Sequence, residues 1–188
     1  MVSILCNALK EIIDAPYLDK RYGLVFAAKG KGSGGNAIVF PIENGEKTCE
    51  LSRAAVPNAK YRALSYFESN VPTTSIKVGE GKLYISYLSF VVWMNTDKIN
   101  FEDEFIADKI MSDLEKKISS IKNMSFDGGS ISKAMVSKLH SKSHDIFAKY
   151  SYPDKSKYLA NPYNAIKLDF EIHYSLTCGD VIINPKSC

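Results

Sequence analysis

The sequence predicts a single α+β domain, with an N-terminal helix and a mostly antiparallel sheet packed against a long amphipathic helix. Three segments support this prediction. Residues 82–94 are apolar on both alternating faces, which is typical of a central strand covered on two sides. Residues 101–121 repeat apolar side chains at helical spacing, and residues 166–176 alternate between apolar and polar side chains.

The size and composition fit one folded domain of 188 residues, 45% of them hydrophobic. Lys and Arg outnumber Asp and Glu by 24 to 21, and this net charge of +3 is too small to indicate nucleic-acid or membrane binding by itself. The first residues lack the pattern of a secretory signal, and no apolar run approaches the ~18 residues of a membrane span. We therefore expect an intracellular protein that is neither exported by this route nor membrane-spanning.

The N-terminal third predicts one helix and two strands. Residues 3–14 place apolar side chains at helical spacing, with Ser3 as the N-cap. Two short apolar runs, 22–28 and 37–42, predict strands. The segment 29–36 between them is rich in glycine and lysine, which predicts a mobile hairpin loop.

The middle of the chain predicts fewer elements. Residues 43–74 contain scattered turn signals, and only a short strand near 48–51 is expected there. Asn100 can cap the helix 101–121, whose early turns are acidic. The stretch 125–160 reads as a Lys/Ser-rich insertion, helical through its apolar residues up to 149 and then an aromatic-anchored loop.

The glycine-rich loop is the one segment that resembles a nucleotide-binding motif. Gly30, Gly32 and Gly35 satisfy G-x-G-x-x-G, but a dinucleotide site needs a helix directly afterwards, and here a strand follows. The kinase and Walker motifs are incomplete as well. We interpret the segment as a basic hairpin tip used in assembly, and a small nucleotide- or phosphate-binding enzyme using Gly30–Gly35 is the alternative.

Other candidate chemistry is sparse. His140 and His144 would share a face if residues 131–149 were helical, as two metal ligands must, but no third ligand is identifiable. His173 falls on the polar side of its strand, and the four cysteines form no C-x-x-C pair, so we interpret them as reduced thiols. We therefore predict no catalytic residue, no metal ligand and no cofactor.

Charge is distributed unevenly along the chain. Residues 97–115 hold seven acids and two lysines, whereas residues 116–157 hold nine lysines and three acids. A solvated helix with an acidic start accounts for part of this pattern. The sharper interpretation is complementarity between copies of the chain in a head-to-tail ring.

The order of elements resembles that of bacteriophage tail-terminator and tail-completion proteins and of the related neck ring proteins. The resemblance rests on the pattern of the helix Ile4–Ile13, the strand Tyr84–Trp93, the helix 101–121 and the closing strand 168–174, which together span about half of the chain. The Gly/Lys hairpin and the Lys/Ser insertion depart from that family. No residue-specific motif carries the resemblance.

The resemblance implies a non-enzymatic structural protein of the virion. In that family a small subunit forms a ring that caps the tail tube or joins it to the connector. The partners would be copies of the chain itself and neighbouring tail or connector proteins, with DNA only where the ring lumen carries it. A cytosolic adaptor domain with a peptide-binding sheet edge is a further alternative.

Two groups of residues are the predicted interaction sites. The hairpin loop offers Lys29, Lys31, Gly32 and Gly34. The central strand offers Val92 and Trp93, one on each face, because a single helix can cover only one face and the other would need a partner.

Overall fold

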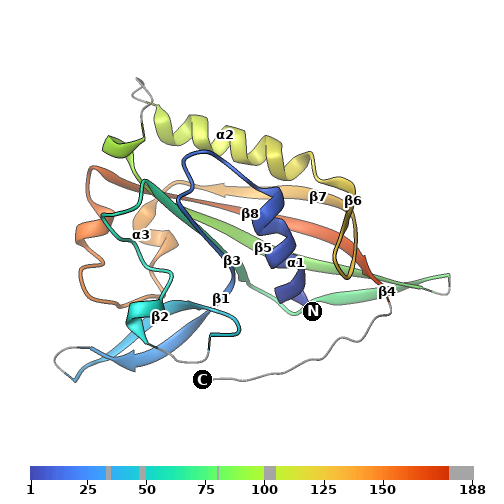
Figure 1. Cartoon of the computed structure of the whole chain (residues 1–188), viewed down its shortest axis with the longest axis horizontal. Coiled ribbons are helices and arrows are strands. Elements are labelled where there is room, and N and C mark those ends of the chain that lie inside the picture. The colour runs from blue at the N-terminus through green and yellow to red at the C-terminus, as the bar shows by residue number, and fades with distance from the viewer. Residues whose placement is uncertain (33–34, 47–49, 80, 100–104, 178–188) are drawn as a thin grey trace.

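The protein is mostly β, so the α+β prediction is wrong. A computed structural model describes residues 1–32, 35–46, 50–79, 81–99 and 105–177, and 46% of the described residues lie in strands. Eight strands form one mixed sheet, and the three α-helices are short. Figure 1 shows α1 and α2 on one side of the sheet and α3 near the β1–β2 hairpin.

The strands run in the order β2-β1-β3-β5-β8-β7-β6, and β4 pairs with β5 beside this path. All neighbours are antiparallel except β1 and β3, which are parallel. The bounds are β1 Lys20–Lys31, β2 Ala37–Glu43, β3 Ala63–Ser69, β4 Thr74–Val78, β5 Gly81–Asn95, β6 Lys122–Phe126, β7 Gly129–His140 and β8 Tyr163–Leu176.

The helices are α1 Val2–Ile12, α2 Ile106–Ser119 and α3 Ser143–Ile146, with single 3-10 turns η1 Leu51–Arg53, η2 Thr96–Lys98 and η3 Lys157–Leu159. The long helix predicted over 101–121 is therefore a 14-residue helix in the described part of the chain. Its residues Ile110, Leu114 and Ile118 are buried beneath it. The N-terminal helix is confirmed, although Ser3 is not its cap, because the helix already begins at Val2.

Several strand predictions are confirmed. The segments 22–28, 37–42, 82–94 and 166–176 all lie in strands. The strand expected near 48–51 is wrong for its described residues, where a 3-10 turn begins at Leu51. The strands β3, β4 and β6 were not predicted.

The helix predicted after residue 130 is wrong. Residues 129–140 form β7, which pairs along β8. Two bulges interrupt this pairing, one between Ile131 and Lys133 and one between Val136 and Lys138. Each bulge shifts the alternation of side chains by one residue, so core-facing positions fall three or two residues apart and imitate a helical period.

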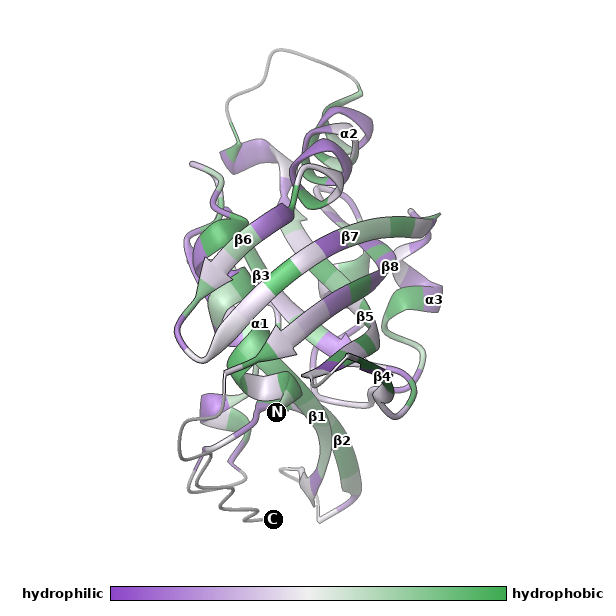
Figure 2. Ribbon diagram, turned by 90° about the vertical axis from the view of Figure 1, so that its right-hand side faces the viewer, coloured by the Kyte–Doolittle hydropathy of each residue, from purple (hydrophilic) through white to green (hydrophobic). Residues whose placement is uncertain are grey.

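The core lies on both faces of the sheet. One face of β5 packs Leu88, Phe90 and Val92 with residues of α1 and α2. The other face packs Val91 and Trp93 with the β1–β2 hairpin and with the segment 146–152. In Figure 2, β1 and β2 are largely hydrophobic along their length, in agreement with their role as a cover for this second face.

We predict that Val92→Lys and Trp93→Lys both prevent folding. Each side chain is fully buried, and the two lie on opposite faces of β5, so either lysine would place an unpaired charge in a core. Tyr87→Lys is the matched control, because Tyr87 lies on the same strand but is 43% exposed. Circular dichroism should show a folded control and two unfolded variants. A folded Trp93→Lys variant would contradict the assignment of a second core.

Candidate functional site

The Gly/Lys hairpin is more ordered than the sequence suggested. Lys29 and Lys31 belong to β1, and both are exposed. The N–H of Gly32 donates to the carbonyl oxygen of Asn36 over 2.9 Å, and Gly34 lies outside the described residues. Gly30 faces inwards, because a Cβ built there would lie 2.8 Å from the ring of Phe40. Close packing therefore explains the glycine at position 30 without a bound phosphate.

Val92 and Trp93 are not available to a partner. Both are fully buried within the chain, which corrects the expectation that one of these faces stays uncovered. The indole N–H of Trp93 donates to the carbonyl oxygen of Tyr158 over 2.9 Å. Its ring stacks on Tyr163 with centroids 5.2 Å apart. The tyrosine-rich segment before β8, together with the β1–β2 hairpin, is the cover that the sequence pattern did not reveal.

An open face does exist, further along the same strand. Side chains that share the face of Trp93 become accessible towards the start of β5, where Leu83 and Ile85 are half-buried and Tyr87 is exposed. The register places Glu171 of β8 beside Tyr87 and Met135 of β7 beyond Glu171. The covered and open halves of one sheet face therefore meet near the middle of β5.

The most exposed part of this face is a projecting hairpin, which we call the arm and define as residues 74–79 and 81–85. β4 pairs only with β5, and the pairing of β5 with β8 ends at Tyr84 opposite Tyr174. Residues 81–83 therefore extend about 10 Å beyond the last pair with β8. Figure 1 shows this hairpin reaching past the other strands at one end of the sheet.

The two sides of the arm differ in chemistry. Ile76 lies opposite Leu83 and Val78 opposite Gly81, so these residues share one side. Ile76 is 52% exposed and Val78 is 59% exposed. On the other side Lys77 lies directly opposite Lys82. The sequence contained a signal for this feature, since residues 75–78 alternate between polar and aliphatic side chains.

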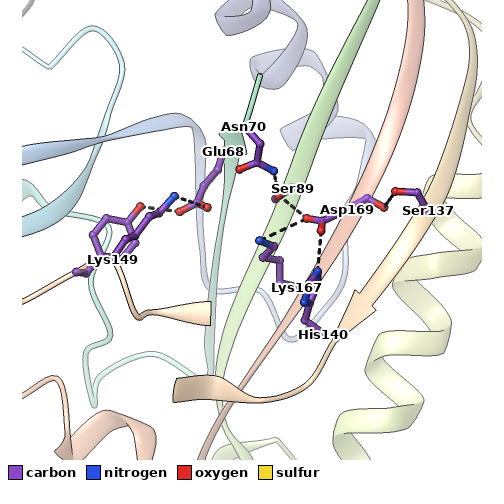
Figure 3. A network of polar contacts seen from close by, with 9 residues as sticks. Glu68, Asn70, Ser89, Ser137, His140, Lys149, Lys167 and Asp169 are labelled. Carbon is purple, nitrogen blue, oxygen red and sulfur yellow. Dashed lines mark hydrogen bonds and ion pairs between the residues drawn. The ribbon is translucent and has the colours of Figure 1, made fainter. Parts of the chain in front are cut away.

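A polar network joins β5, β7 and β8 to Asn70, the residue after β3, where the covered and open halves meet (Figure 3). Ser89 of β5 donates to Oδ1 of Asp169 over 2.5 Å and accepts from Nδ2 of Asn70 over 2.6 Å. His140, the last residue of β7, has Nε2 2.6 Å from Oδ2 of Asp169. The ammonium group of Lys167 lies 3.5 Å from Oδ1 of the same carboxylate.

Asp169 is the centre of this network and is held in its charged form. Burial opposes ionisation, but the hydrogen bonds from Ser89 and His140 and the charge of Lys167 outweigh it and lower the pKa of the carboxyl group. Both carboxylate oxygens are engaged by neighbouring strands. The network therefore fixes β5, β7, β8 and the residue that follows β3 relative to one another.

The order of groups in the network does not suit a nucleophilic triad. A serine nucleophile needs the histidine as its direct partner, with the carboxylate behind the histidine. Here Asp169 stands between Ser89 and His140, so the imidazole cannot take the serine proton. Ser89 is also fully buried. Its role is structural.

A second polar cluster lies next to this network, on the covered half of the sheet. The carboxylate of Glu68 is almost fully buried, accepts a hydrogen bond from Tyr150 Oη over 2.6 Å and lies 2.7 Å from Nζ of Lys149. Burial and the neighbouring Glu68 raise the pKa of Tyr150. Tyr66 is fully buried beside Tyr150, and burial raises the pKa of its hydroxyl as well. The cluster ties the segment after α3 to β3.

The described histidines and Cys6 are not gathered at one place in the structure. His140 and His144 do not share a helix face, because His140 ends β7 whereas His144 lies in α3. His173 contacts Glu171 on its own strand. Among the described residues, no three His, Cys, Asp or Glu side chains lie close enough to hold a metal ion. Cys6 is buried, which raises the pKa of its thiol and makes it a poor nucleophile.

Comparisons with known proteins do not assign the chain to a family: no protein-family model matches the sequence, and no curated protein gives a significant match. Within the described part of the chain, no helix is long and apolar enough to cross a membrane.

We predict that Asp169→Asn lowers the free energy of unfolding by about 1–3 kcal/mol at pH 7, because the amide cannot accept all the hydrogen bonds made to the carboxylate. The pKa of Asp169 is lowered in the folded state, so its contribution is present above its ordinary value of 3.8 and is lost as the pH falls through the lower folded value. The difference between the two proteins should therefore shrink below about pH 4.

Urea unfolding at a series of pH values measures this difference. Asp145→Asn is the control, because Asp145 is an exposed carboxylate on α3. It should change stability by no more than about 0.5 kcal/mol. A loss of the same size for Asp169→Asn at pH 7 and pH 3 would contradict a role for the ionised carboxylate.

Proposed function

We propose that the chain is a non-enzymatic structural subunit that assembles with copies of itself into a ring, as in the tail or head-to-tail neck of a bacteriophage. The observation that carries this proposal is the arm. It places Ile76 and Val78, each more than half exposed, on a two-stranded ribbon that projects beyond the rest of the sheet.

Such a ribbon is only weakly stabilised in an isolated chain. A two-stranded hairpin is marginally stable in water unless a third strand or a packed face supports it. The outer edge of β4 has no strand partner among the described residues, so its backbone groups and aliphatic side chains are both open to another chain. Contact with a neighbouring subunit would supply the missing support.

The rest of the molecule is compatible with a structural role. Its most connected polar group, Asp169, fixes strands, and its glycine at position 30 is explained by packing against Phe40. The pattern resemblance to phage tail and neck ring proteins gives the proposal its ring geometry. Neighbouring tail or connector proteins would be the further partners, and DNA would be met only in the ring lumen.

We predict that the purified chain forms rings and that Ile76→Asp abolishes them without unfolding the subunit. The new carboxylate would lie on the apolar side of the arm, where docking must remove it from water. Val71→Asp is the matched control, because Val71 is also an exposed aliphatic residue, at 45% exposure, but precedes the arm.

Light scattering after size exclusion measures the mass, and negative-stain images show the shape. The unmodified chain and Val71→Asp should give closed rings, and Ile76→Asp should give monomers with an unchanged circular dichroism spectrum. A chain that stays monomeric at the highest concentration tested would refute the proposal. A monomer that captures one soluble protein partner would favour the adaptor alternative instead.

A further inference from the structure

A hollow lies at the opposite end of β5 from the arm. The chain passes from the end of β5 through the turn Thr96–Lys98, and α2 begins nearby at Ile106. Together with residues 159–164 these segments enclose a hollow of about 730 Å³. A hollow of this size is within the range that accepts several side chains of a ligand. Figure 1 shows the start of α2 and the tip of the arm at opposite ends of the molecule.

The lining of the hollow combines acidic, neutral polar and apolar side chains. Asp97 and Asp108 both line it, and none of the described residues of the lining is a lysine or an arginine. Both acids are exposed, and neither makes a hydrogen bond or an ion pair with another described residue. The apolar part includes Phe105, which is 64% exposed, together with Leu159 and Pro162.

The arm is complementary to this lining. Its apolar side offers Ile76 and Val78, and its other side offers Lys77 and Lys82, which lie directly opposite each other. Two like charges in this position repel each other, and neither lysine has an ion-pair partner among the described residues. Two carboxylates would relieve that repulsion.

We propose that the arm of one copy docks into the hollow of the next copy, with Lys77 and Lys82 against Asp97 and Asp108 and with Ile76 and Val78 against the apolar part around Phe105. This inference rests on the proposed function and adds to it the two surfaces that meet.

The position of the two surfaces determines the kind of assembly. A contact between different patches on two copies is heterologous, and repetition of such a contact gives a closed ring or an open filament. The arm extends from the start of β5 and the hollow begins after its end, so they are separated by a 15-residue strand. A strand of that length spans about 50 Å. The arm and the hollow therefore cannot meet within one chain. Contact between the arm of one copy and the hollow of the next is the geometry of a head-to-tail ring.

We predict that reversing the charge of either surface abolishes assembly and that reversing both restores it. The arm variant is Lys77→Glu with Lys82→Glu, and the hollow variant is Asp97→Lys with Asp108→Lys. Each variant alone places like charges at every contact, whereas the quadruple variant has the original pairing in reverse. All four residues are exposed, so the subunits should stay folded.

Lys122→Glu with Lys133→Glu is the matched control. These two exposed lysines also lie opposite each other, on β6 and β7, and their replacement changes the net charge as the arm variant does. Light scattering and circular dichroism are measured for every variant. We expect rings from the unmodified chain, the control and the quadruple variant, and folded monomers from the two double variants.

The possible results separate the two proposals. If the unmodified chain does not assemble, the proposed function itself fails. If it assembles but the arm and hollow variants assemble as well, or the quadruple variant does not recover, the docking proposal is wrong and the proposed function stands. Lysines that serve DNA binding instead would leave the arm variant assembled and reduce only its retention of DNA, which would also overturn the docking proposal.

Discussion

The structure depends on the need to cover both faces of β5. Residues 90–94 of this strand are essentially inaccessible, and successive side chains enter different cores. Burial of one such aliphatic or aromatic side chain contributes about 1.5–3 kcal/mol, so neither face can be left in water over this length. The helices α1 and α2 cover one face. The β1–β2 hairpin and the segment after α3 cover the other, and their cover stops near the middle of the strand.

The sequence predicted those parts of the fold that local pattern determines. The double-sided apolar run of β5 and the strict alternation of β8 both identify their strands, because burial alone sets each pattern. The strand β7 escaped prediction because two bulges change its period, and β3 because both of its faces are buried and Ser65 and Glu68 interrupt its apolar run. The segment that covers the second face could not be predicted from local pattern, because its tyrosines lie in an irregular segment and show no periodicity.

The polar network around Asp169 likewise depends on tertiary contacts that local sequence pattern does not predict. Asn70, Ser89, His140 and Asp169 come from distant parts of the chain, and only the sheet register brings them together. The sequence alone places Gly30 in a loop, whereas close packing against the ring of Phe40 is what requires a glycine there. The uneven charge along the sequence did indicate complementary surfaces. The lysines now implicated belong to β4 and β5, however, and precede the lysine-rich stretch on which that interpretation rested.

Contact between the arm of one copy and the hollow of the next is the central claim, and a photo-crosslinker in place of Phe105 tests it most directly. Benzoylphenylalanine keeps an aromatic ring at this exposed position in the hollow. Irradiation of the assembled protein should give a ladder of linked copies, and mass spectrometry should identify the attached peptide as part of residues 74–85. Links to any other segment of the neighbouring copy, or links only within one chain, would contradict the account.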